Sequence, residues 1–395
     1  MSKLSSLRFR TLTLALALWF LAATQAHAAS RTIARCGQGW LEEIDGLMVL
    51  HVAGSPYEMG YQHGVLLREH VKANLNHLLD DQFKKVRLDL PGFQVGPENV
   101  VAGIVAMQKP HIPAWYTEEI RGLAEGAGLS VGRVTRGNFV PELFHCSGFA
   151  VLGSTTRDGV LYHGRVLDYA TDWRLQEHAV LVVSKPDKGI PAVNVTFAGF
   201  VGSVTGMNAE NISIGEMGGG GLGHWNGVPM AVLVRWALRD AKSLDEALAV
   251  FKDNPRTCQY FYVAADGKAN RAVGFEASWD TFRVVNPGEK IDLLPRPVKD
   301  AVLLSAGDRY NCLVDRVEKG HGKIDAAGAL KLMDRGVAMK SNLHNVLFAP
   351  ASTRFWVSYA GVDKTPAAER SYQEFNLQEL LERKPGEGSP ELSRK

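Results

Sequence analysis

The sequence feature that most constrains this fold is an Asp158-Gly159 pair between two strand-like runs within residues 145–169. An Asp-Gly pair in this setting predicts a β-hairpin, because glycine adopts positive φ without steric cost. Three reactive side chains stand near the two ends of the hairpin: Cys146, Arg165 and Asp168. The turn therefore predicts that a thiol, a cation and a carboxylate lie close together.

The register of this hairpin follows from the position of the turn. If residues 157 and 160 pair, Cys146 lies opposite position 171, and Asp168 is about one diagonal neighbour away. A slip of one residue would move each side chain to the other face of the sheet. The sequence thus predicts proximity more firmly than orientation.

Residues 1–28 have the pattern of a secretory signal peptide. Three basic residues precede an apolar run from Leu14 to Ala23, and the small residues of Ala26-His27-Ala28 follow it. We expect an exported protein with no stable membrane span after cleavage, and an uncleaved anchor is the alternative. Without this segment the formal net charge changes from +2 to −1, since three basic and no acidic residues are removed. The remaining chain has no basic stripe for nucleic acid.

The remaining chain divides by its patterns into three parts. Residues 29–145 are helix-rich, with an amphipathic helix of about 25 residues predicted from Ser55-Pro56. Residues 146–383 are dominated by short strand-like runs, and residues 384–395 are rich in Pro, Gly, Glu and Lys, which predicts a disordered tail. A glycine-rich run at residues 215–223 reads as a loop that could donate backbone N–H groups to a ligand.

The cysteines exclude some kinds of site. Four scattered cysteines do not have the paired spacing of a metal cluster, and no cofactor is expected. If Cys146 is a working thiolate, at most one disulfide can form among the others, and Cys36 could pair with either Cys258 or Cys312.

Cys146 has two interpretations, a small buried core residue or a nucleophile. Its neighbour His145 points to the opposite face of a strand, and His163 is more simply a structural residue. A cut before Cys146 would supply another base, because an ordinary α-amine has a pKa of about 7.7–8.0 and the new one lies within reach of its own thiol. Such a site also requires a carboxylate, a cation and backbone N–H donors, which are the groups that Asp168, Arg165 and the glycine run provide.

These segments resemble the N-terminal-nucleophile hydrolases of the penicillin acyltransferase and linear-amide hydrolase group, relatives of the choloylglycine hydrolases and acid ceramidase. The resemblance rests on residues 57–64, 119–130, 146–150, 158–159, 164–169, 206–208 and 215–221. It implies a four-layer αββα sandwich of antiparallel sheets. It also implies that Cys146 is the nucleophile, that Arg165 and Asp168 organise it, and that Gly218 is the approximate backbone oxyanion donor.

The sequence departs from the family pattern after the strand predicted near residues 301–304. The family usually has a Thr-Asn pair there, whereas this chain has Asp308 nearest the Asn position, and an ionised carboxylate cannot donate a hydrogen bond to an oxyanion. Asn311 could serve from a displaced position. A family arginine falls at Arg316, which could equally be a surface helix charge.

The expectation is an exported precursor that cuts itself between His145 and Cys146 and cleaves a linear amide of a small-molecule substrate through a thioester. Acyl transfer to an amine, or a catalytically silent binding protein on the same scaffold, are the alternatives. The oligomeric state is left open. Four aromatic residues are candidates for the substrate walls: Phe200, Trp225, Tyr260 and Tyr262.

Overall fold

The computed structural model describes residues 30–82, 88–90, 93–95, 97–139, 145–221 and 223–393. The expected signal peptide, residues 1–28, lies outside this part of the chain, and so do residues 140–144 just before the expected cut. Within the described ranges, no helix combines the length and the apolar character needed to cross a lipid bilayer.

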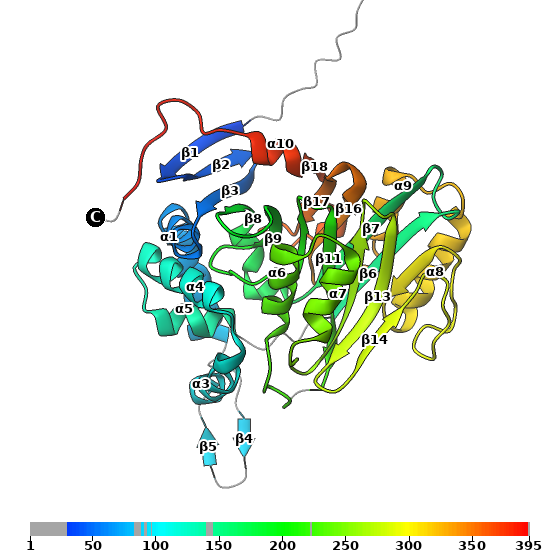
Figure 1. The fold of residues 1–395 in the computed structure, drawn as a ribbon, viewed down its shortest axis with the longest axis horizontal. Coiled ribbons are helices and arrows are strands. Elements are labelled where there is room, and N and C mark those ends of the chain that lie inside the picture. The colour runs from blue at the N-terminus through cyan, green and yellow to red at the C-terminus, as the bar shows by residue number, and fades with distance from the viewer. Residues whose placement is uncertain are drawn as a thin grey trace, which may run out of the picture.

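A ten-stranded sheet forms the larger of two layers of strands (Figure 1). In spatial order its strands are β1 (Ser30–Cys36), β2 (Gly39–Ile44), β3 (Leu47–Gly54), β8 (Ala179–Pro186), β9 (Ala192–Phe197), β10 (Thr205–Asn208), β11 (Ile212–Gly220), β12 (Gln259–Asp266), β13 (Arg271–Ser278) and β14 (Phe282–Val285). Its strands pair antiparallel except β3 and β8, which run parallel. This pairing joins the N-terminal strands to the rest of the sheet.

A six-stranded antiparallel sheet carries the predicted hairpin. Its order is β15 (Ala301–Leu304), β6 (His145–Gly153), β7 (Gly159–Asp168), β16 (Asn342–Ala349), β17 (Arg354–Tyr359) and β18 (Gln373–Asn376). A separate pair, β4 (Leu88–Leu90) and β5 (Phe93–Val95), forms a small third sheet.

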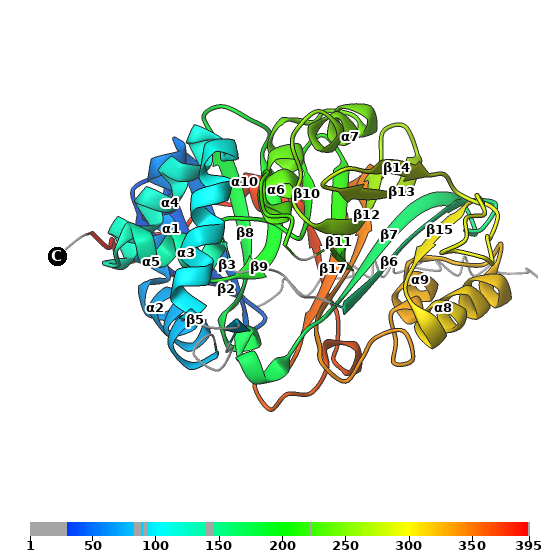
Figure 2. The same cartoon turned by 90° about the horizontal axis from the view of Figure 1, so that it is seen from below.

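Helices cover the outer faces of both large sheets, as Figure 2 shows. On the side of the ten-stranded sheet lie α1 (Pro56–Leu66), α2 (Arg68–Asn76), α3 (Pro97–Gln108), α4 (Ala114–Ala127), α5 (Val131–Asn138), α6 (Met230–Asp240) and α7 (Leu244–Lys252). On the side of the six-stranded sheet lie α8 (Gly307–Gly320) and α9 (Ala326–Leu332), and α10 (Leu377–Glu382) follows β18.

Apolar side chains of the two sheets pack against each other in one buried core. Val49 and Leu181 contribute from the larger sheet, and Phe149 and Val346 from the smaller. A second core joins the outer face of the larger sheet to its helices. The layers are thus helix, sheet, sheet and helix, and the expected αββα sandwich is confirmed.

The hairpin forms, but the predicted register is wrong. Cys146 pairs with Leu167, and His145 pairs with Asp168. The register shifts between Val151 and Gly153, and the connection is longer than a two-residue turn. The carboxylate of Asp300 holds this loop, since its Oδ2 atom accepts hydrogen bonds from Ser154 N at 2.9 Å and Ser154 Oγ at 2.5 Å.

Three other segments differ from their sequence patterns. The predicted helix of residues 55 onward is interrupted at Leu67 between α1 and α2. Most of the glycine run extends β11, because β12 supplies hydrogen-bond partners as far as Gly220. The C-terminal segment, where the composition predicts disorder, lies along β1: Arg35 N donates to Pro390 O at 2.8 Å, and Leu392 N donates to Arg35 O at 2.7 Å.

Helices α1 and α4 pack at very close range through glycines. A Cβ atom on Gly122 would collide with the main-chain carbonyl oxygen of Tyr57, and one on Gly60 would collide with that of Glu119. Backbone on both sides leaves no flexible side chain to move aside. The two glycines therefore allow the helices to approach at the distance of their main chains.

We expect Gly122→Ala to lower the free energy of unfolding by about 3 kcal/mol, because overpacking against a main chain cannot relax locally. Gly103→Ala on α3 is the matched control: no atom lies within 4 Å of its added Cβ, and the better helix propensity of alanine should stabilise the protein by about 1 kcal/mol. Urea denaturation measures both. Equal stabilities of the two variants would contradict the packing argument.

Candidate active site

Cys146 lies at the start of β6, buried between the sheets. The guanidinium of Arg165 on β7 donates from Nη2 to Cys146 Sγ at 3.4 Å. The backbone N–H of Gly218 on β11 donates to the same sulfur. A cation and a main-chain donor therefore both point at the thiol, from strands of the two different sheets.

Arg165 is fully buried, and its charge is balanced within the site. Its Nη2 atom lies 3.3 Å from Glu216 Oε2, its Nε atom donates to the carbonyl oxygen of Glu216 at 3.0 Å, and its Nη1 atom lies 3.3 Å from His344 Nε2. A Cβ atom on Gly215 would lie 2.7 Å from Arg165 Cγ, so the glycine makes room for the guanidinium stem. The sequence interpretation missed Glu216 and His344.

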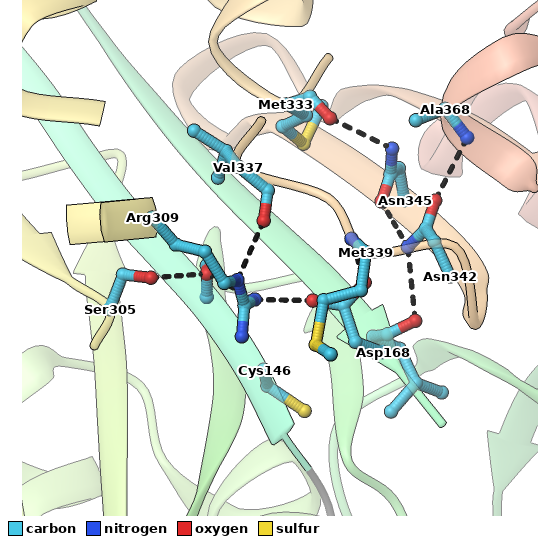
Figure 3. A network of polar contacts seen from close by, with 12 residues as sticks. Cys146, Asp168, Ser305, Arg309, Met333, Val337, Met339, Asn342, Asn345 and Ala368 are labelled. Carbon is cyan, nitrogen blue, oxygen red and sulfur yellow. Dashed lines mark hydrogen bonds and ion pairs between the residues drawn. The ribbon is translucent and has the colours of Figure 1, made fainter. Parts of the chain in front are cut away.

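Asp168, at the end of β7, is held by groups from outside the hairpin, as Figure 3 shows. Arg309 Nη2 forms a short ion pair with Asp168 Oδ2, and Met339 N donates to Asp168 Oδ1 at 2.9 Å. The same Nη2 atom donates to Ser147 Oγ at 2.6 Å, and Ser147 Oγ lies 2.7 Å from Ser305 Oγ. Arg309 thus connects the residue next to Cys146 with Asp168.

Burial dominates the protonation of the site. It raises the pKa of the Cys146 thiol to about 12, against the opposing effect of the Arg165 charge. Burial also raises the pKa of Asp168, with Arg309 opposing it, and raises the pKa of Glu216, with Arg165 opposing it. Glu216 Oε1 has no hydrogen-bond partner among the described residues, and Glu216 Oε2 bonds to Arg165. In the uncut chain the thiol is therefore protonated at neutral pH.

A cavity of about 610 Å³ begins at Cys146 and extends between the sheets. Its walls near the thiol are Met217, the main chain of residues 218–220 and the segment of residues 304–307. Beyond them the lining is mostly apolar, and its polar side chains are Gln259 on β12, Glu276 on β13 and Arg283 on β14. The thiol has a route to a substrate-sized space.

The structure brings four of the predicted site residues together and separates three others from them. Asp308, Asn311 and Arg316 lie on α8, away from the Cys146 cavity, beside a shallow surface hollow. Asp308 and Asn311 are exposed, and Arg316 donates hydrogen bonds to the carbonyl oxygens of residues 332, 334 and 335. Since successive helix residues are about 100° apart, the start of α8 directs Arg309, and not its neighbour Asp308, toward the site.

The remaining sequence candidates take structural places. None of the four aromatic residues expected as substrate walls lines the cavity; Tyr260 and Tyr262 belong to the core on the helix side of the larger sheet. All four cysteines are free, so Cys36 pairs with neither candidate partner. Within the described ranges, no cluster of three or more His, Cys, Asp or Glu side chains is arranged to hold a metal ion.

We compared the chain with known proteins. No protein-family model matches the chain. Protein dcd1B of Dictyostelium discoideum is 24% identical over 386 residues, covering 87% of this chain and 77% of that protein. An N-acylethanolamine-hydrolyzing acid amidase of Cavia porcellus is 26% identical over 176 residues, covering 42% of this chain and 49% of the amidase. The resemblance to the N-terminal-nucleophile hydrolases is confirmed.

Solved structures with some likeness have low overall similarity. The Caenorhabditis elegans N-acylethanolamine-hydrolyzing acid amidase ortholog has a TM-score of 0.42 at 16% identity, covering 52% of this chain and 93% of that one. Penicillin V acylase from Agrobacterium tumefaciens has a TM-score of 0.37 at 11% identity, covering 54% of this chain and 83% of that one. The sheet topology, and not these similarities, defines the four-layer fold.

Proposed function

We propose that this chain is a cysteine amidohydrolase that cleaves linear amides through a thioester, with Cys146 as the nucleophile. The observation that carries the proposal is the placement of the Cys146 sulfur at one end of a cavity, with the Arg165 guanidinium and the Gly218 N–H both donating to it. The N-acylethanolamine-hydrolyzing relatives act on amides, which supports the same reaction class.

The proposal includes a cut between His145 and Cys146. In the uncut chain the thiol is protonated and no base is bonded to it among the described residues, so it is a poor nucleophile. The cut would create an α-amine on Cys146 itself, which can accept the thiol proton. Asp168 pairs with His145 across the hairpin, and its carboxylate would lie beside the new amine and orient it.

The reaction then proceeds in two stages. The Cys146 sulfur attacks the amide carbonyl carbon while its proton passes to the α-amine. The negative charge that develops on the carbonyl oxygen can be stabilised by the Gly218 N–H, a main-chain donor held in place by β11. The C–N bond breaks, the amine product takes the proton and leaves, and water cleaves the thioester to release the acid. An acceptor amine in place of water would make the same site an acyltransferase.

Export belongs to the same proposal, on the basis of the basic start and apolar run of residues 1–28. An exported site has water available in excess, which favours hydrolysis over acyl transfer.

Intact mass spectrometry of the purified protein tests the proposal. We expect two fragments with a boundary at Cys146, and a transient mass increase on the Cys146 fragment equal to one acyl group when amides are added. Product analysis with and without added amines distinguishes hydrolysis from transfer. A single chain that gains no acyl mass with any amide, although Cys146 reacts with alkylating agents, would overturn it.

A further inference from the structure

One row of side chains connects the thiol to the far end of its cavity. Met217, Phe261, Glu276 and Arg283 are direct cross-strand partners on β11, β12, β13 and β14. Directly opposite residues of neighbouring strands share a face, and all four line the cavity. The row therefore runs from the Gly218 end of β11 across the sheet, away from Cys146.

The row is apolar near the thiol and charged at its far end. Gln259 Nε2 donates to Glu276 Oε1 at 2.6 Å, and Arg283 Nη2 donates to Glu276 Oε2 at 3.1 Å. The Glu276 side chain is 11% exposed, whereas that of Arg283 is 49% exposed. Glu276 is thus a fixed, nearly buried carboxylate that holds the guanidinium at the cavity wall.

The guanidinium of Arg283 has N–H donors that are available to a ligand. Arginine has five N–H donors, and the bond to Glu276 is the only side-chain hydrogen bond of Arg283 within the described ranges. Hydrogen bonds from Asn286 N at 2.9 Å and Nδ2 at 3.0 Å lower the pKa of Glu289, and the Arg283 charge acts in the same direction, so this carboxylate is already bonded elsewhere. The free donors can therefore bind an acceptor in the cavity.

We propose that Arg283 binds a carboxylate at the remote end of the substrate, so that this site takes amides whose chain carries an acid group away from the scissile bond. This inference rests on the proposed amidase function. A half-exposed guanidinium oriented by a buried carboxylate has the fork geometry that recognises carboxylates. Both oxygens of Glu276 already accept hydrogen bonds, and an ammonium group there would face the Arg283 charge.

The spacing between strands sets the distance between the scissile amide and the remote carboxylate of the substrate. The Arg283 guanidinium lies over β13, two strands from β11, which is about 10 Å at ~4.8 Å per strand. Phe261 lies on β12, the strand between them, and Val285 and Leu294 add further apolar surface to the same cavity. Apolar walls over this distance fit a chain of methylene groups.

Calorimetric binding of three simple probes tests the inference without turnover. The probes are octanoate, 1-octanol and octylamine, which share a chain and differ in the end group. We expect octanoate to bind about tenfold more tightly than 1-octanol, the size of a charge-assisted hydrogen bond, and octylamine to bind no better than 1-octanol. In Arg283→Gln the tenfold preference should fall to about twofold or less.

Two further variants control the experiment. Arg271→Gln removes an arginine of β13 that forms an ion pair with Asp245 and does not line the cavity. This variant should keep the preference for octanoate. Arg283→Gln could unfold because it leaves Glu276 unpaired. In that case the double variant Glu276→Gln/Arg283→Gln, which removes both charges, is measured in place of the single variant. An octanoate preference that survives in the Arg283 variants, or an octylamine preference in the wild type, would overturn the inference.

The binding result is independent of the proposed function. If no amide acylates Cys146 but octanoate binding depends on Arg283, the amidase proposal fails and the carboxylate site remains. If amides acylate Cys146 while octanoate shows no dependence on Arg283, the amidase proposal stands and the substrate class is wrong.

Discussion

Cys146→Ala should remain a single chain and lose amidase activity by at least about 10³-fold, the size of effect seen when a nucleophile is removed. Alanine has neither the sulfur that attacks the amide nor the thiol that would cut the chain before it. The small apolar side chain fits a buried position, so the fold should survive. Intact mass measures the cut, and an amide hydrolysis assay measures the activity.

Cys312→Ala is the matched control for this variant. Cys312 is another free cysteine, on α8 and outside the Cys146 cavity, so its removal should change neither the cut nor the activity. If Cys146→Ala were still cut between residues 145 and 146, or still hydrolysed amides at the wild-type rate, Cys146 could not be the nucleophile.

Arg165→Met should lower the free energy of unfolding by about 3–5 kcal/mol. The loss of a fully buried guanidinium leaves Glu216 buried without its partner, and methionine, which is shorter and has no N–H donor, cannot satisfy the carboxylate. Activity should fall as well, because Cys146 Sγ loses its side-chain donor. Urea denaturation followed by circular dichroism measures the stability.

The double variant Arg165→Met/Glu216→Gln separates the two roles of Arg165. Without the buried carboxylate, most of the lost stability should return, while the amidase activity should stay low because the cation beside the thiol is still absent. Recovery of activity together with stability would show that Arg165 acts only through packing and charge balance. A double variant no more stable than Arg165→Met would mean that Glu216 is not the source of the penalty.

The hairpin was predictable because its determinants are local. An Asp-Gly pair and two strand-like runs predicted a hairpin at residues 145–169, and proximity of Cys146, Arg165 and Asp168 followed from it. The register was not predictable, because the shift at Leu152 and the loop depend on Asp300, a residue far along the chain.

The partners of these residues were missed for the same reason. Glu216, His344 and Arg309 reach the site from β11, β16 and α8, and in sequence each is an ordinary residue of its segment. The resemblance indicated the stretch from Ser305 to Asn311, yet only the direction of the first turn of α8 decides which side chain faces Asp168. A single sequence does not determine how this helix is rotated about its axis.

The parallel pairing of β3 with β8 has a consequence for a cut chain. If the chain is severed before Cys146, the ten-stranded sheet still contains β1 to β3 from one fragment and seven strands from the other. The mature protein would then be a heterodimer with no stable separate halves. Its unfolding would be a dissociation, so its melting temperature would rise with protein concentration, as for any obligate dimer, whereas that of the uncut Cys146→Ala chain would not.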